Sequence, residues 1–213
     1  MTGQPMSHSP RSAAILAGGQ ATRFGGRDKS ALVIDGRAIL DRQIFALSPV
    51  IDDLLIVGRA DTGLAPAGGA TAERRAARVI PDIVPGCGPL GGLHAALTAA
   101  RHDTLFLIAC DMPYVPAALI EYLLSLAGDG VDAVVPRTER GYHPLCAVYT
   151  RACLEPAAAR LADRRLKMRD LVDAVRTRVV TADDIRRFGE PDRLLANVNT
   201  PADFAELEAL QGH

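Results

Sequence analysis

The chain has few aromatic residues and little net charge, and both features narrow the range of partners. Aromatic residues make up 4% of the 213 residues, and the formal net charge is −1. Nucleic-acid-binding proteins typically carry a basic surface, often with aromatic side chains on which bases stack. The sequence contains no basic patch rich in aromatics, so nucleic acid is not expected as its main partner.

Long apolar runs are also missing. A membrane-spanning helix needs about 20 consecutive apolar residues, and no segment reaches that length. Residues 1–11 are polar and contain two prolines, without the apolar centre of a signal peptide. We expect a disordered tail there and a protein that acts in the cytoplasm, away from membranes.

Close cysteine pairs are absent as well. The four cysteines are Cys87, Cys110, Cys146 and Cys153, and no two of them form a CxxC motif. Two of them lie in apolar, strand-like segments, where free cysteine behaves as a small buried hydrophobic residue. We therefore expect buried thiols in a reducing compartment.

The sequence does contain enough apolar residues for a sizeable core, at 48% hydrophobic and 23% charged. Short apolar segments alternate with segments of helical periodicity. Strands are expected at 12–17, 54–57, 79–80, 104–110, 132–135, 145–149 and 177–181, and helices at 38–48, 90–101, 117–127, 152–163, 168–175 and 201–210. This alternation predicts one Rossmann-like, three-layer α/β domain over residues 12–213, with a mostly parallel sheet between helices on both faces.

Three motifs follow expected strands, and together they place a candidate site. They are the glycine-rich segment after 12–17, Asp82 after 79–80, and Asp111 after 104–110. In an open α/β sheet, ligands bind beyond the carboxyl ends of the strands. The convergence of the three motifs at one edge is stronger evidence than any single motif.

Lysine is scarce, and one of the two lysines closes the glycine-rich segment. Lys29 and Lys167 are the only lysines among 24 Lys and Arg residues, and residues 16–29 read LAGGQATRFGGRDK. The spacing matches neither the Walker loop GxxxxGK[ST] nor the Rossmann fingerprint GxGxxG.

The amides of residues 17–19 can approach a nucleotide closely because glycine has no Cβ. Arg23 and Lys29 can neutralise a triphosphate and the leaving pyrophosphate; the alternative is a turn with solvated charges.

Five segments in order resemble one enzyme family. They are LAGG…RFGGRDK at 16–29, IPD at 80–82 with GPLGGL at 88–93, CDMPY at 110–114, HPLCAVY at 143–149, and NVNTP at 197–201. The set is similar to the nucleotidyltransferases that build molybdenum cofactor dinucleotides. Most closely it resembles the molybdenum cofactor guanylyltransferases, which join GMP from GTP to molybdopterin. The resemblance covers residues 13–208.

The resemblance implies specific roles for the matching residues. The nucleotide would contact Leu16, Ala17, Gly18, Gly19, Lys29, Gly58, Asp82 and Asp111. Lys29, Arg23 and Asp111 would be catalytic, with Asp111 binding Mg²⁺, which favours a carboxylate combined with phosphate oxygens. Asn197, Asn199 and His143 would bind the acceptor, molybdopterin or the molybdenum cofactor. Molybdoenzymes or their chaperones would be further partners.

Several of these residues have a plain structural alternative. Asp111 can cap the helix that follows it, and Asp82 can be part of a Pro-Asp turn. His143 can be a satisfied residue at a strand end. Gly88 to Gly92 can serve close helix packing or substrate binding. The basic residues Arg164, Arg165, Lys167 and Arg169 can form a solvated face or bind the acceptor phosphate.

The choice of base and the reaction itself also have alternatives. Gly58 stands where some relatives place an asparagine near the base, and glycine can contact a base only through its backbone. Guanylyl transfer is the expectation; a cytidylyltransferase for the same cofactor, or a nucleotidyltransferase for another phosphorylated acceptor, remains open. So does a nucleotide-binding protein without turnover, although that class would have no need for both Lys29 and Asp111.

Overall fold

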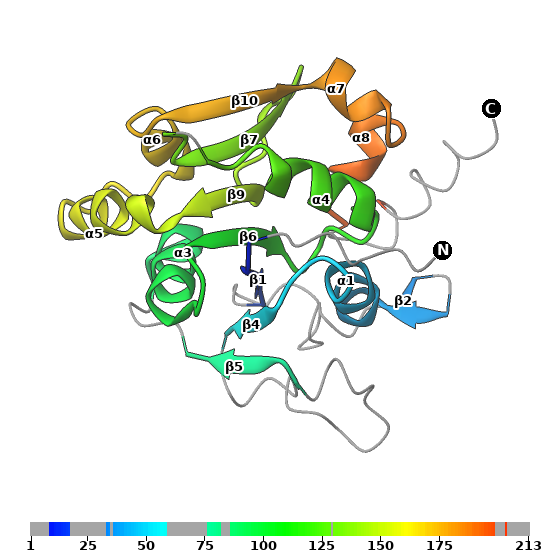
Figure 1. Ribbon diagram of the computed structural model, residues 1–213, viewed down its shortest axis with the longest axis horizontal. Helices are drawn as coiled ribbons and strands as arrows, with labels where there is room; N and C mark the ends of the chain where they lie inside the picture. The colour runs from blue at the N-terminus through cyan, green and yellow to red at the C-terminus, as the bar shows by residue number, and fades with distance from the viewer. Residues whose placement is uncertain are drawn as a thin grey trace.

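The structure is built on one mixed, eight-stranded sheet (Figure 1). The computed structural model describes residues 9–17, 33–34, 36–58, 76–81, 86–128, 130–198 and 203. The strand order is β10-β7-β9-β6-β1-β4-β5, with β8 paired to β7. The strands are β1 Arg11–Leu16, β4 Asp53–Val57, β5 Arg78–Ile80, β6 Thr104–Ala109, β7 Ala133–Thr138, β8 Gly141–Tyr142, β9 Cys146–Thr150 and β10 Thr177–Thr181. A separate ribbon pairs β2 Val33–Ile34 with β3 Arg37–Ala38.

Helices cover both faces of the sheet, as Figure 1 shows. They are α1 Ile39–Leu47, α3 Gly88–Ala99, α4 Ala117–Ser125, the 3-10 turn η3 Arg151–Cys153, α5 Leu154–Ala162, α6 Met168–Val172, α7 Ala182–Arg186 and α8 Pro191–Leu194. The cluster on one face includes buried residues of α1, α4, α7 and α8, and the cluster on the other includes residues of α3, α5 and α6. The predicted three-layer architecture is confirmed.

The alternation of side chains along the strands explains why the sheet is buried on both faces. In β1, Ala13 and Ile15 belong to one core cluster, whereas Ala14 and Leu16 belong to the other. Successive side chains of a strand point to opposite faces, so a strand covered by helices on both sides must be apolar throughout. The continuous apolar run of the first predicted strand follows from this requirement.

Most neighbouring strands are parallel, as the sequence predicted. β1 is parallel to both β4 and β6, β4 is parallel to β5, and β10 is parallel to β7. The exception is the pair of strands β8 and β9: β8 is antiparallel to β7, and β9 is antiparallel to both β6 and β7. It arises because β8 and β9 return directly after β7 without a crossover helix. The amino-terminal end of β9 therefore meets the carboxyl end of β6.

Some boundaries and short elements differ from the sequence expectation. Arg11, placed in the tail, is the first residue of β1, and α3 begins at Gly88 with Pro89 in its first turn. β8, α7 and α8 were not expected, because two to five residues are too few for a periodic pattern. The rest of the predicted tail, residues 1–8, and nearly all of the predicted helix at 201–210 lie outside the described residues. Within the described part of the chain, no helix is long and apolar enough to cross a membrane.

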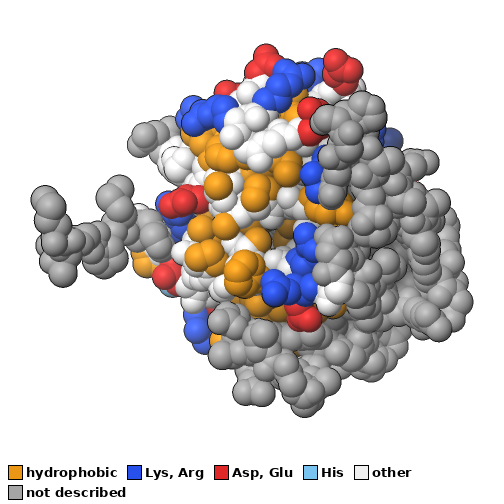
Figure 2. Space-filling view, turned by 90° about the vertical axis from the view of Figure 1, so that its right-hand side faces the viewer, with side chains coloured by type: hydrophobic (Ala, Val, Ile, Leu, Met, Phe, Trp, Pro, Cys, Tyr) orange, Lys and Arg blue, Asp and Glu red, His pale blue; other side chains and the backbone are white. Residues whose placement is uncertain are grey.

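The face beyond α1 carries an exposed aromatic side chain. Phe45 is 70% exposed, and the guanidinium carbon of Arg37 lies 5.3 Å from the centre of its ring. Figure 2 shows apolar side chains on this side of the molecule with Lys and Arg side chains beside them. Phe45 thus belongs to the surface, although it stands in a helix whose other large apolar residues are buried.

A buried carboxylate joins the starts of the central strands. Asp53, at the start of β4, accepts hydrogen bonds from Arg78 Nε at 3.0 Å and Nη2 at 2.8 Å, and from Ser12 Oγ at 3.0 Å. The backbone amide of Arg101 donates a further bond at 3.1 Å. Burial alone would raise the pKa of Asp53, but these donors, Arg78 foremost, lower it below the usual 3.8.

We expect Asp53→Asn to lower the free energy of unfolding by roughly 2 to 3 kcal/mol at neutral pH, since it leaves the partly exposed Arg78 without its counter-charge. A carboxyl whose pKa is depressed in the folded state stabilises the protein above its ordinary pKa, and loses that contribution as the pH falls through the folded value. The variant should therefore lose less stability than the wild type below about pH 4. Urea unfolding at a series of pH values checks both points. Parallel pH curves for the two proteins would contradict the assignment.

Candidate active site at the carboxyl ends of the strands

Backbone hydrogen bonds join the ends of four strands, β1, β4, β5 and β6, at one edge of the sheet. The amide of Ala17 donates to the carbonyl of Val57 at 2.8 Å, and the amide of Gly58 donates to that of Ile80 at 3.0 Å. The amide of Cys110 donates to the carbonyl of Leu16 at 3.1 Å. The loops after β1, β4 and β6 therefore begin side by side, as predicted for the edge that binds ligands.

These bonds limit which backbone atoms of two predicted residues a nucleotide could contact. The amides of Ala17 and Gly58 are engaged within the sheet, so a nucleotide contact at either residue would use the carbonyl oxygen. Leu16 is the last residue of β1, and its side chain is buried. The other predicted residues of this half of the site lie outside the described residues; they are Gly18, Gly19, Arg23, Lys29, Asp82 and Asn199.

Asp111, two residues after β6, is held by a segment from far along the chain. Asn197 Nδ2 donates to Asp111 Oδ1 at 2.7 Å. The amide of Val198 donates to the carbonyl of Asp111 at 2.8 Å. Two predicted site residues are thus in direct contact, and the asparagine motif sits at the candidate metal-binding carboxylate.

Asp111 is not a helix cap, which was the structural alternative for this residue. The next helix, α4, begins at Ala117, and its N-cap residue is Pro116, which provides no side-chain hydrogen bond. Asp111 therefore lies five residues before the cap, at the end of a buried strand. Its half-buried carboxylate is placed for a role in the site.

A buried glutamine that sequence reasoning missed supports this loop. Gln43 of α1 is 3% exposed, and its Nε2 donates to the carbonyl of Ala109 at 2.7 Å and to that of Met112 at 3.0 Å. These two carbonyls bracket Asp111. The sequence did indicate that Gln43 is buried, because it lies on the apolar face of the helix between Leu40 and Leu47.

A pocket of about 220 Å³ lies next to Asp111. We call it the strand-end pocket. It is lined by Met112, Tyr142, His143, Pro144, Leu145, Cys146, Met168 and Asn197. Most of these residues belong to the segment from β8 to the start of β9, which the antiparallel return of β9 brings to the end of β6. The pocket is mainly apolar, with a few polar groups that can orient a ligand, as is typical of small-molecule sites.

His143 has both a pocket-facing and a structural role. It lines the strand-end pocket, and its Nε2 lies 2.9 Å from Thr138 Oγ1. Its amide donates to the carbonyl of Pro136 at 2.8 Å. Burial lowers the pKa of the imidazole below 6.5, as does Arg140, against an opposing effect of Asp192. His143 is therefore neutral near pH 7 and can accept or donate one hydrogen bond toward a ligand.

The glycine-rich start of α3 allows close packing. A Cβ on Gly92 would lie 2.9 Å from Leu16 Cδ2, so a residue with a side chain there would require the end of the Leu16 side chain to shift. At Gly88, φ is +60°, a left-handed conformation that residues with a side chain rarely adopt. Gly92 thus supports the packing interpretation of this motif, because its lack of a side chain leaves room for Leu16 between α3 and β1.

The basic residues before and within α6 surround Met168, which lines the pocket. Arg164, Arg165, Lys167 and Arg169 are exposed. Arg165 and Arg169 form long ion pairs with Asp170 at 3.7 Å and Asp173 at 3.4 Å. Ion pairs this exposed contribute little to stability, so these cations can exchange their partners for a ligand.

Three of the four cysteines are buried, as the sequence predicted. These are Cys87, Cys146 and Cys153, whereas Cys110 is half-buried; none of the four forms a disulfide. Burial raises the pKa of Cys146 and of Cys153 to about 12. Such thiols are protonated at neutral pH and unreactive.

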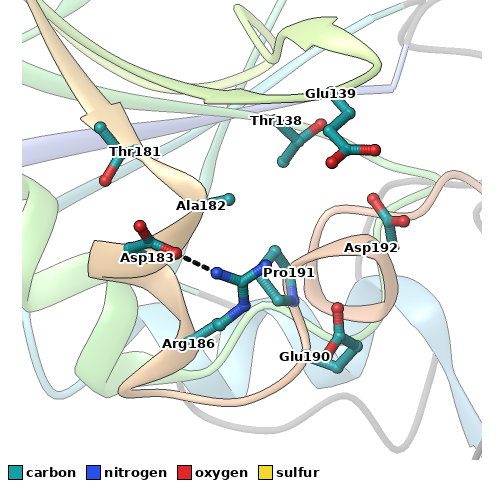
Figure 3. A pocket seen from close by; sticks show the side chains of 9 residues that line it. All are labelled: Thr138, Glu139, Thr181, Ala182, Asp183, Arg186, Glu190, Pro191 and Asp192. Atoms are coloured by element: carbon teal, nitrogen blue, oxygen red, sulfur yellow. Dashed lines mark hydrogen bonds and ion pairs between the residues drawn. The ribbon is translucent and has the colours of Figure 1, made fainter.

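A second hollow, of about 430 Å³, is unsuited to phosphates. It lies between the β7–β8 turn and helices α7 and α8, and four carboxylates line it, from Glu139, Asp183, Glu190 and Asp192. Figure 3 shows Asp183 paired with Arg186, the one cation of the lining, on one wall, with Glu139 and Asp192 on the other. The net negative charge would repel a triphosphate.

Among the described residues at the carboxyl ends of β1, β4, β5 and β6, Asp111 is the one carboxylate that could contact a metal ion. The described residues include no group of three or more His, Cys, Asp or Glu side chains that could hold a metal by themselves. This fits Mg²⁺ in a nucleotide enzyme, which is usually held by one or two carboxylates together with substrate phosphates and water.

Comparison with known proteins identifies the family. Residues 13–180 match the model of the MobA-like NTP transferase domain. The chain belongs to this family. It is 35% identical over 196 residues to the molybdenum cofactor guanylyltransferase of Desulfosudis oleivorans, covering 92% of this chain and 93% of that protein. It is 32% identical over 197 residues to the probable molybdenum cofactor guanylyltransferase of Pelotomaculum thermopropionicum, covering 92% and 91%.

A solved structure shares the fold of this MobA-like domain. Molybdopterin-guanine dinucleotide biosynthesis protein A from Archaeoglobus fulgidus superposes with a TM-score of 0.74 at 24% identity, covering 94% of this chain and 98% of that one. The nucleotidyltransferase fold predicted from the sequence is thereby confirmed.

We expect Gln43→Met to lower the free energy of unfolding by about 1 to 3 kcal/mol. It removes two hydrogen bonds to carbonyls of the Asp111 loop while preserving the volume of the side chain. Phe45→Ala, in the same helix but exposed, is the matched control and should change stability by less than about 0.5 kcal/mol. Denaturant unfolding measures both variants, and equal effects would show that the Gln43 bonds do not stabilise the fold.

We expect the stability of the wild type to fall between about pH 7.5 and 5.5, and to fall less in His143→Gln. The pKa of His143 is lowered in the folded protein, so the unfolded chain takes up the proton first as the pH drops below 6.5. Chemical unfolding at several pH values measures the two slopes. The carboxyl groups with depressed pKa titrate at lower pH, so equal slopes in this window would exclude His143 as the source.

Proposed function

We propose that the chain transfers GMP from GTP to the phosphate of molybdopterin or the molybdenum cofactor, releasing pyrophosphate and forming the guanine dinucleotide cofactor. Two relatives that share at least 32% identity over nine-tenths of the chain carry the name of this activity. The observation in the structure that carries the proposal is the contact of Asn197 with Asp111 beside the strand-end pocket. That contact joins a candidate metal-binding carboxylate to a candidate acceptor pocket.

The reaction needs positioning and charge compensation more than covalent chemistry. An oxygen of the acceptor phosphate attacks the α-phosphorus of GTP, a new P–O bond forms, and the bond to pyrophosphate breaks. Both reactants are anions, so binding them together in the correct orientation accounts for most of the rate. Lys29 and Arg23 neutralise the triphosphate and the leaving pyrophosphate in this proposal.

Asp111 would hold Mg²⁺ between itself and the phosphates of GTP. The ion supplies a concentrated positive charge that compensates the developing charge on the phosphate oxygens. Asn197 donates a hydrogen bond to Asp111 Oδ1, which fixes the orientation of the carboxylate that would contact the ion. Gln43 holds the carbonyls on either side, so the loop keeps its shape when charge accumulates near it.

The strand-end pocket would bind the acceptor. Its apolar wall, from Met112 and Leu145 to Met168, suits a flat heterocycle such as a pterin. Asn197 and the neutral imidazole of His143 can orient its polar edge by hydrogen bonds. Asn199 would add a contact at the phosphate end, and Asp82 would contact the nucleotide with Leu16, Ala17, Gly18, Gly19 and Gly58.

The compartment and the partners beyond the substrates are also proposals. Four free cysteines are typical of a reducing compartment, and GTP is available in the cytoplasm, so we propose that the chain acts there. Delivery of the product to molybdoenzymes or their chaperones would follow the transfer.

Pyrophosphate release by the purified protein tests the function. With molybdopterin, Mg²⁺ and each nucleoside triphosphate in turn, we expect release with GTP and a large loss without Mg²⁺. Release with CTP alone would replace the proposal by the cytidylyl reaction. Tight GTP binding without any release would favour a non-catalytic binding protein.

Substitutions of Asp111 and Lys29 should lower the activity of the protein without lowering its stability. We expect Asp111→Asn and Lys29→Ala each to lower kcat/KM by roughly a hundredfold or more, because each removes charge compensation in the transition state. Their thermal unfolding should stay close to that of the wild type. Asp163→Asn, at the exposed end of α5, is the matched control and should retain activity. A large loss of stability in Lys29→Ala would show that Lys29 is structural.

A further inference from the structure

Two arginines stack against a tyrosine that lines the strand-end pocket. The guanidinium carbon of Arg137 lies 5.3 Å from the ring centre of Tyr142, and that of Arg169 lies 5.9 Å from it. Tyr142 itself lines the pocket. Two positive charges are therefore held next to the pocket by cation–π contacts with Tyr142, although neither arginine lines the pocket itself.

The secondary structure holds this cluster in place from two elements. Arg137 of β7 is the register partner of Tyr142 in β8, so the two side chains are on the same face of the hairpin. Arg169 comes from α6, directly after Met168, which also lines the pocket. The cluster is thus built on a strand pair and a helix, and Tyr142 connects it to the pocket.

The cluster lies at a distance from the candidate metal-binding carboxylate. Arg137 belongs to β7, which is two strands away from β6 in the order β6-β9-β7, and two strand spacings amount to roughly 10 Å. Asp111 and Asn197 are at the end of β6. A ligand that fills the pocket from the Asp111 side and extends past Tyr142 would reach the arginine pair.

The charges around the cluster leave it positive. Arg169 has a long ion pair with Asp173 at 3.4 Å, in which both side chains are more than half exposed. Arg137 is exposed, and among the described residues no carboxylate forms an ion pair with it. An anion that approaches Tyr142 can displace the weak pair of Arg169 and meet two guanidinium groups, which bind oxyanions and thiolates by charge-assisted hydrogen bonds.

We propose that Arg137 and Arg169, positioned by Tyr142, bind a second anionic group of the acceptor, remote from the phosphate that receives GMP. The proposal rests on the proposed function, and it extends that function by a separate subsite. In molybdopterin such a group is the pair of dithiolene sulfurs. In the metal-loaded acceptor it is the oxygen-ligated molybdenum centre held by those sulfurs.

Steady-state kinetics of Arg137→Gln, Arg169→Gln and the double variant test the proposal. We expect the KM for the acceptor to rise roughly three- to tenfold for each single variant, and further for the double variant. The KM for GTP should not change. Added salt should raise the acceptor KM of the wild type more steeply than that of the double variant, because the removed contacts are ionic.

Arg178→Gln is the matched control. Arg178 is an exposed arginine of β10, and it pairs in register with Val134, whose side chain is on the opposite face of the sheet from that of Arg137. It should leave every parameter unchanged. Arg137→Lys should recover part of the acceptor affinity, and thermal unfolding of all the variants should match the wild type.

The outcomes separate the two proposals. No pyrophosphate release by the wild type with molybdopterin would refute the proposed function itself. An active wild type with an unchanged acceptor KM in the double variant would overturn the subsite alone, as would a rise in the KM for GTP. A loss of affinity for molybdopterin with and without molybdenum would support the subsite and identify the sulfurs as the bound group. A loss only with the metal-loaded form would support it and identify the oxygen-ligated centre.

Discussion

The parallel pairing of β1 with both of its neighbours is the constraint on which the site depends. β1 lies between β4 and β6, and all three run in the same direction. Their carboxyl ends therefore share one edge, and three loops far apart in the sequence start within hydrogen-bonding reach of one another. Apolar side chains on both faces of β1 fix its register, because a shift by one residue would exchange the two faces.

The opposite edge of the sheet carries the polar contacts that hold the strands together. Asp53 joins the start of β4 to β1 and β5, and Asp132, directly before β7, accepts three hydrogen bonds from Arg176 before β10. These bonds keep the pKa of Asp132 below its usual value. The hydrogen bonds of Asp53 and Asp132 thus join the strands at the edge of the sheet opposite the candidate active site. The loops at the ligand edge can therefore vary without loss of these contacts.

Much of the fold, and the general place of the site, could be predicted from the sequence. The core strands are apolar throughout and end on polar residues, so Asp111 could be placed at the edge of the sheet before any contact was known. Gln43 was missed because an isolated polar residue in a helical stripe is usually assigned to the surface. His143 and Asn197, which line the strand-end pocket, were named from the sequence, but the arginine cluster on Tyr142 was missed for another reason. Tyr142 belongs to a two-residue strand, and its neighbours Arg137 and Arg169 come together only through tertiary pairing.

The contact between Asn197 and Asp111 joins positions 86 residues apart, and this separation has a consequence for the time course of folding. Such a long loop must close before the contact can form, and contacts of this kind are made late. During synthesis the core strands β1, β4 and β6 emerge well before residue 197. A nascent chain can therefore complete most of its sheet while its candidate metal-binding carboxylate still has no asparagine to orient it, and catalytic competence would be acquired as one of the last steps of folding.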